Sequence, residues 1–236
     1  NIKSLFTSTD NLNKEMTTLK NNLESLNVDE ILAALTAMFP DAHCELNHRN
    51  AYELLVAVVL SAQTTDASVN RVTPALFARF PTPQDMAAAD EEEIGSYIRS
   101  IGLYRSKARS LRALSASLCE QFDGVVPSTY KELMSLAGVG RKTANVVRSV
   151  CFDIPSFAVD THVERVSKRL GLAKPQDDVR KVEEKLKRKL PRERWNKGHH
   201  LFIFFGRYLC TARSPKCGIC PFSSICRRQK IEAKNA

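Results

Sequence analysis

Four cysteines near the end of the chain are spaced like the ligands of one inorganic centre. They follow the pattern Cys210-x6-Cys217-x2-Cys220-x5-Cys226, four thiols within 17 residues. Four thiolates can hold either tetrahedral zinc or a [4Fe–4S] cluster. Structural zinc sites usually combine two Cys-x2-Cys pairs, whereas this segment has one pair and two longer arms, which favours the larger cluster. A group of buried free thiols is the remaining alternative.

A turn between two glycines, followed at once by basic residues, forms the second candidate site. Residues 136–144 read Leu-Ala-Gly-Val-Gly-Arg-Lys-Thr-Ala, and residues 100–105 repeat this pattern less fully. Gly138 and Gly140 permit a tight hairpin whose N–H groups face solvent, and the following helix adds the positive end of its dipole. We expect the hairpin to bind nucleic-acid phosphate through its backbone. A plain corner between two helices is the alternative.

Lys142 and Asp160 form a candidate catalytic pair. The helix dipole disfavours an ammonium in the first turn, so the amine of Lys142 is a candidate nucleophile that forms a Schiff base with a sugar carbon. Asp160 stands eighteen residues later in the run Val-Asp-Thr-His-Val-Glu. Because Thr161 and Glu164 fit a capping box, we expect Thr161 to cap the next helix and Asp160 to be free for catalysis. An N-cap role for Asp160 is the alternative.

Composition and charge limit the class of protein and its partners. The chain has 236 residues, of which 43% are hydrophobic and 26% charged, and no apolar run has the ~18 residues of a membrane helix. Residues 151–236 carry 20 basic and 9 acidic side chains, against 15 and 17 in residues 1–150. This asymmetry favours duplex DNA over a membrane as partner, although a solvated lysine-rich helix explains part of residues 181–189. The free thiols Cys44, Cys119 and Cys151 and an oxygen-sensitive cluster favour a reducing, cytoplasmic location, and we expect a monomer.

Hydrophobic periodicity predicts an all-α fold, because no segment alternates like a strand. The expected helices span residues 29–39, 51–62, 66–80, 90–100, 105–121, 128–136, 141–150, 162–170, 178–190 and 193–208, and the second of them is apolar all round. Residues 1–27 form a separate extension, partly helical or disordered, with an amphipathic stripe at Leu12, Met16, Leu19, Leu23 and Leu26. No targeting signal is readable in it.

The hairpin with its lysine, the Val-Asp-Thr-His run and the cysteine spacing together resemble the endonuclease III family of the helix–hairpin–helix–Gly/Pro–Asp superfamily of DNA glycosylases. The resemblance spans residues 29–228 and includes the stretches 60–66 and 101–104. It implies a two-domain helical fold: a six-helix domain of residues 44–154 with the helix–hairpin–helix motif, and an iron–sulfur domain of residues 28–43 plus 155–236.

The resemblance also implies a base excision repair enzyme. Such an enzyme flips an oxidised or ring-saturated pyrimidine out of duplex DNA, attacks C1′ with Lys142 and cleaves the abasic site by β-elimination, while Asp160 stabilises the cationic transition state. Gln63 and Leu103 enter the duplex, and the four cysteines hold a structural [4Fe–4S] cluster. The remaining DNA contacts come from the hairpin region and a basic loop, namely Gly138, Val139, Gly140, Arg141, Thr143, Arg213 and Lys216. Ala137 stands where many relatives have proline, which changes the rigidity of the hairpin and not the chemistry.

Two other functions share some of these features. A mismatch-specific glycosylase has the same fold and cluster but lacks a lysine nucleophile at this position, so Lys142 disfavours it. A non-catalytic DNA-binding module with a redox-sensing cluster needs no lysine at a dipole-opposed site, so Lys142 together with Asp160 disfavours it.

Overall fold

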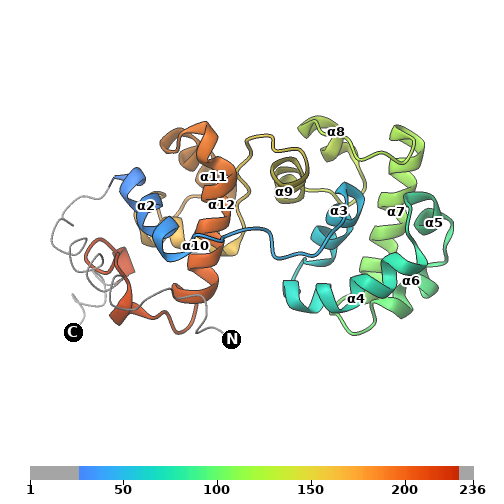
Figure 1. The fold of residues 1–236 in the computed structure, drawn as a ribbon, viewed down its shortest axis with the longest axis horizontal. Coiled ribbons are helices and arrows are strands. Elements are labelled where there is room, and N and C mark those ends of the chain that lie inside the picture. Colours follow the sequence, from blue (N-terminus) through green and yellow to red (C-terminus); the bar gives the residue numbers. More distant parts are fainter. Residues whose placement is uncertain (1–26, 229–236) are drawn as a thin grey trace. The chain divides into compact units, whose positions relative to one another are not determined.

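The computed structural model describes residues 27–228, and its regular elements in that range are all helical (Figure 1). The all-α prediction is therefore confirmed. The stripe predicted for residues 12–26 lies outside the described residues. The α-helices are α2 (Val28–Met38), α3 (Ala51–Leu60), α4 (Asp66–Arg79), α5 (Pro83–Ala88), α6 (Glu91–Tyr97), α7 (Tyr104–Phe122), α8 (Tyr130–Ser135), α9 (Arg141–Cys151), α10 (Thr161–Arg169), α11 (Val179–Lys189) and α12 (Trp195–Phe204).

Two elements differ from the sequence-based prediction. The short helix α5 was not predicted, because six residues are too few to show a period; its signal is local, with Pro83 at the first turn and a capping box between Thr82 and Asp85. The helix predicted over residues 193–208 is three elements. A 3₁₀ turn (Arg192–Arg194) precedes α12, and a π-helical turn (Phe205–Leu209) follows it.

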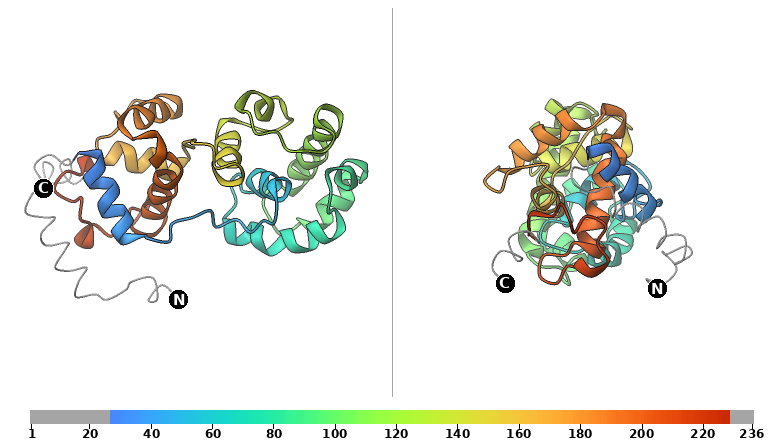
Figure 2. Two further views of the ribbon diagram at one scale, coloured as in Figure 1. Left: turned by 45° about the horizontal axis from the view of Figure 1, so that its top comes forward. Right: turned by 90° about the vertical axis from the view of Figure 1, so that its left-hand side faces the viewer.

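The chain forms two compact units, one of residues 44–158 and one that combines the segments on either side of it. The sequence-based division put the second boundary at residue 154, and the compact unit extends to residue 158. The first unit contains α3 to α9. The second contains α2 together with α10, α11 and α12, so helices from opposite ends of the chain lie side by side (Figure 2).

Unit 44–158 is built around α3. Eight of its ten residues are buried, including Leu54, Leu55 and Val56 with no exposed area, as expected for a helix that is apolar all round. α9 packs against α3, and α7 packs against α5 and α6. These contacts hold in place the starts of α4, α7 and α9, which carry most of the predicted DNA-contacting residues.

The other unit is closed by α2 packing against α12. After α2 ends, the ammonium of Lys197 on α12 donates to the carbonyl oxygens of Pro40 and Ala42 at 2.6 and 3.1 Å. The segment that leaves α2 is therefore tied to α12. None of the helices between residues 27 and 228 is long and apolar enough to cross a bilayer.

Candidate active site and metal centre

The glycine hairpin joins α8 to α9. Gly138 has a φ of +75°, a left-handed conformation that glycine adopts without steric cost. The Val139 N–H donates to the Leu136 carbonyl at 3.2 Å, and the Val139 side chain is buried. The expectation that all hairpin N–H groups face solvent is therefore wrong at Val139, since a turn this tight closes on its own carbonyl. Val139 anchors the hairpin to the core.

The helices α6, α7 and α9 begin without a side-chain cap hydrogen bond, at Asp90, Leu103 and Gly140 respectively. In the same unit, α3, α4, α5 and α8 each have a cap whose side chain accepts a backbone hydrogen bond, from Asn50, Thr65, Thr82 and Thr129 respectively. Within α9 the first N–H to reach a backbone acceptor is that of Ala144, which donates to the Gly140 carbonyl at 3.0 Å. The N–H groups of Lys142 and Thr143 and the positive dipole end are thus placed to bind an anion.

Lys142 is exposed in the first turn of α9, beside exposed Arg141 and half-buried Thr143. The pKa of the Cys44 thiol is raised, mainly because the thiol is buried. A hydrogen bond with the backbone of Leu46 opposes this shift. Among the charged groups, Asp66 raises the pKa and Lys142 lowers it. Lys142 and the first residue of α4 therefore both act electrostatically on the same thiol.

Gln63 and Leu103 share an uncommon backbone conformation. Their φ angles are +55° and +60°, and the other described non-glycine residues with positive φ are Asp123 and Asp153. Left-handed backbone is strained for a leucine, and such strain gathers at functional sites. Gln63 is exposed, and Leu103 is 60% exposed. An exposed leucine in a fixed, strained turn is suited to inserting into a partner.

Asp160 is the N-cap of α10. Its Oδ1 accepts hydrogen bonds from the N–H groups of His162 and Val163, both at 2.9 Å. The predicted capping box is wrong: Thr161 is the first helical residue, and Glu164 forms an ion pair with Lys168 at 2.6 Å. An aspartate caps better than a threonine and here satisfies two donors. Within the described residues no hydrogen bond reaches Oδ2, so this oxygen can face a ligand.

Two arginines of α10 bind the segment that contains the first cysteine. Arg165 donates to the carbonyls of Gly206 at 2.8 Å and Cys210 at 3.2 Å. Arg169 donates to the Thr211 carbonyl at 2.8 Å and to Sγ of Cys210 at 3.2 Å. The sequence analysis missed both residues. Their spacing of four, which puts them on one helical face, is the signal that the sequence offers.

The four cysteines line one cavity. Cys210, Cys220 and Cys226 are buried and Cys217 is half-buried. Between residues 27 and 228 no group of three or more His, Cys, Asp or Glu side chains is arranged to hold a single metal ion. Four thiols around one cavity fit an iron–sulfur centre with four cysteine ligands. Burial raises the pKa of the Cys220 thiol to about 12, so a thiolate at this one position needs a cationic partner.

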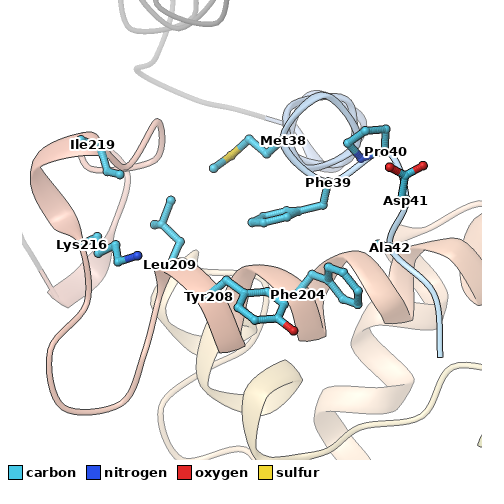
Figure 3. A pocket seen from close by; sticks show the side chains of 10 residues that line it. All are labelled: Met38, Phe39, Pro40, Asp41, Ala42, Phe204, Tyr208, Leu209, Lys216 and Ile219. Carbon is cyan, nitrogen blue, oxygen red and sulfur yellow. The ribbon is translucent and has the colours of Figure 1, made fainter. Parts of the chain in front are cut away.

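A second cavity, open to solvent, lies beside the same loop (Figure 3). Its lining is mostly apolar, with Phe39, Phe204 and Leu209 facing the space and the stem of Lys216 along one side. It contains none of the predicted catalytic residues. Arg213 and Lys216, which are predicted DNA contacts, are both exposed.

Comparison with known sequences identifies the family. The profile of the HhH-GPD superfamily base excision DNA repair proteins matches residues 56–192, and that of the iron–sulfur binding domain of endonuclease III matches residues 210–226. Endonuclease III of Bacillus subtilis (strain 168) is 56% identical over 198 residues, which are 84% of this chain and 90% of the relative. Endonuclease III of Escherichia coli (strain K12) is 44% identical over 204 residues, 86% and 96% of the two chains.

Comparison with solved structures gives the same family as comparison with known sequences. A trapped covalent intermediate of an endonuclease III with DNA superposes with a TM-score of 0.85 at 54% identity, covering 89% of this chain and all of the other. A non-covalent endonuclease III–DNA complex has the same TM-score and identity and covers 88% and 97%. A thermostable thymine-DNA glycosylase shares the fold, with a TM-score of 0.72 at 22% identity over 95% and 100% of the chains. The chain belongs to the HhH-GPD superfamily and, within it, to the endonuclease III family of DNA glycosylases with abasic-site lyase activity, which carry a [4Fe–4S] cluster.

Proposed function

We propose that this protein removes oxidised or ring-saturated pyrimidines from duplex DNA and cleaves the resulting abasic site with Lys142 as the nucleophile. The observation that carries the proposal is the exposed lysine in the first turn of an uncapped helix, directly after the glycine hairpin. A phosphate held by the hairpin backbone would bring the adjacent sugar close to this amine. The 54% identity to an endonuclease III trapped covalently on DNA supports the same role.

The proposed DNA contacts are of two kinds: contacts to the phosphate backbone, and side chains that insert into the duplex. The N–H groups at the starts of α7 and α9, with Gly138, Gly140, Arg141 and Thr143, bind the backbone without reading sequence. Arg213 and Lys216 add phosphate contacts from the loop before Cys217. Gln63 and Leu103 occupy the space that the flipped nucleotide leaves, where a polar and an apolar side chain offset the lost stacking.

The chemistry requires one nucleophile and one carboxylate. The lone pair of the Lys142 amine forms a bond to C1′ as the bond from C1′ to the base breaks, and the departing base takes a proton. The sugar ring then opens at C1′–O4′, which leaves a Schiff base between C1′ and Nζ. Loss of a C2′ proton lets the C3′–O bond break, and water finally hydrolyses the Schiff base to free Lys142.

Asp160 is proposed to act through its charge. Its Oδ1 is engaged by two N–H groups of α10, which fix the carboxylate in place, while Oδ2 is left to face the positive charge that develops on the sugar. A fixed charge that needs no reorganisation stabilises a transition state more than a mobile one does. The same oxygen can accept the proton that the Lys142 nitrogen loses once it has bonded to C1′.

We propose that Cys210, Cys217, Cys220 and Cys226 hold the [4Fe–4S] cluster. Its place in the fold is structural: it fixes the loop of residues 211–216, and Arg169 ties that loop to α10. No step of base removal passes through it. One copy of the chain supplies every residue named, which supports action as a monomer, and the cluster suits a reducing location such as the cytoplasm.

Borohydride trapping on duplex DNA with an abasic site tests the nucleophile. The wild-type protein should give a covalent adduct, and Lys142→Gln should bind the same DNA and give none. Lys181→Gln, the same change of charge at an exposed position of α11, is the control and should trap normally. An adduct from Lys142→Gln at the wild-type rate would assign the nucleophile to another amine. Wild-type protein that binds lesion DNA without base release or adduct would instead indicate a non-catalytic module.

A further inference from the structure

Lys107 is a buried lysine on α7 that the proposed chemistry does not use. It is 5% exposed, and burial lowers the pKa of its ammonium. Within the described residues no carboxylate pairs with it, and lysine is almost never this buried without a partner that compensates the charge. Its position therefore requires an explanation other than an ion pair.

The ammonium of Lys107 reaches the loop that carries Gln63. Its Nζ donates to Oγ1 of Thr64 at 2.5 Å, across 43 residues of sequence. The Thr64 hydroxyl in turn donates to the carbonyl of Ala62 at 3.4 Å. Ala62 and Thr64 flank Gln63, so this pair of hydrogen bonds spans the residue and restrains its backbone from both sides.

The backbone of Lys107 holds the other exposed turn. Its N–H donates to the carbonyl of Leu103 at 2.9 Å, the first such bond of α7. One residue thus contacts both loops, through its side chain and through its main chain. Gln63 and Leu103 are both left-handed, and such conformations persist only where the surroundings hold them.

We propose that Lys107 is a positioning residue that holds the Gln63 loop in register with the Leu103 turn, so that both side chains enter the duplex together. This inference rests on the proposed function, in which those two side chains fill the space of the flipped nucleotide. Lys107 itself touches neither the sugar nor the base. Its effect is confined to duplex substrates, because a single strand has no stack to enter.

Two variants remove the contact from opposite sides. Lys107→Met keeps the buried stem and loses the ammonium, and Thr64→Val keeps the shape and loses the hydroxyl. Each should slow single-turnover base release from a duplex with one ring-saturated pyrimidine by ~10-fold, the size of a lost hydrogen bond to a charged group. The double variant should be no slower than Lys107→Met, because the two changes break one contact. Thr64→Ser restores the hydroxyl and should be close to wild type.

Three controls separate positioning from other effects. Borohydride trapping on a single-stranded abasic oligonucleotide should proceed at the wild-type rate in all four variants. The fluorescence of 2-aminopurine placed beside the lesion should rise less on binding of Lys107→Met than of wild type, because the stack is opened less. Arg109→Met, an exposed change of the same charge on α7, should leave all these measurements unchanged.

Two results would overturn the inference. Base release from the duplex by Lys107→Met at the wild-type rate would show that the contact positions nothing. An equal loss on duplex and single-stranded substrates would show a general structural role. Absence of a trapped adduct with the wild-type protein is a different failure, since it removes the proposed nucleophile and the inference with it.

Discussion

Asp160 joins a structural and a chemical role in one side chain. One carboxylate oxygen holds two N–H groups at the start of α10, and the other has no hydrogen bond within the described residues. The cap fixes the side-chain orientation, and the negative charge is compatible with the positive end of the helix dipole. A substitution that keeps the cap of α10 and removes the negative charge can therefore distinguish the structural role from the chemical role.

Asp160→Asn should keep the cap and lose the charge. Asparagine caps about as well as aspartate, so the midpoint of thermal unfolding should stay close to wild type, while base release should slow by orders of magnitude. Asp160→Ala should be as slow and also less stable, by ~1 kcal/mol, because the cap is lost. Single-turnover kinetics and thermal unfolding measure the two effects.

Asp178→Asn is the matched control, since Asp178 caps α11 by accepting from the Lys181 N–H. It should retain both stability and rate. Wild-type base release by Asp160→Asn would remove the carboxylate from the mechanism.

At this scale the sequence predicts residue types better than contacts. The roles of Lys142 and the cysteines could be proposed from spacing, because each motif is local. The cap of α10 could not be predicted, because Asp160 and Thr161 both suit the position and the extended backbone of Asp160 (φ −108°, ψ −174°) decides between them. Lys107 and Arg169 bind partners more than 40 residues away, so their contacts depend on the packing of the fold.

The π-helical turn after α12 is an element whose shape serves the cluster loop. It ends at Leu209, one residue before Cys210, and its Gly206 lies against α10. A Cβ at Gly206 would be 2.9 Å from Cβ and 3.3 Å from Cα of His162. Glycine is therefore required for the close approach that lets Arg165 reach the Gly206 carbonyl.

Gly206→Ala should push α10 and the π turn apart. We expect a loss of ~1–3 kcal/mol in the free energy of unfolding in urea, the range for overpacking a close contact, together with faster release of iron. Gly102→Ala, where no atom lies within 4 Å of the added Cβ, should leave both measurements unchanged. Wild-type stability of Gly206→Ala would mean that the two elements can separate freely.

Element prediction failed where the pattern carries no signal. A helix, a π turn and a 3₁₀ turn have nearly the same hydrophobic spacing over a few residues, so residues 193–208 read as one helix. The long helices with strong hydrophobic periods were predicted. The helix α5 was not, because its six residues are too few to show a period.

Charge is distributed unevenly over the whole molecule. The excess of basic residues after residue 150 includes α11, where three are paired, as Lys185 with Asp177, Lys187 with Glu183 and Arg180 with Glu184. The solvated-helix explanation thus accounts for part of the excess. Arg213 and Lys216 are exposed in a loop tied to α10, which suits them for contact with a polyanion.

Replacing Arg213 and Lys216 together by alanine should flatten the dependence of duplex affinity on salt. If each contacts one phosphate, the slope of log K against log salt should fall by about 1.8. Affinity measured by fluorescence anisotropy over a range of salt concentrations gives the slope. Lys181→Ala with Lys189→Ala removes the same charge from α11 and should keep the wild-type slope. Equal effects of the two pairs would indicate net charge alone.

The insertion of residues 44–158 between the two parts of the other unit has a consequence for synthesis. The inserted unit is complete once residue 158 has left the ribosome, and it can fold at once. The other unit must wait for Cys226, 68 residues later, which takes about 3–14 s at elongation rates of ~5–20 residues per second. Until α12 (Trp195–Phe204) has emerged in that interval, the apolar face of α2, with Ile31, Leu32 and Leu35, has no α12 to cover it. Nascent chains stalled in this window should therefore recruit a chaperone, and chains stalled past Cys226 should release it.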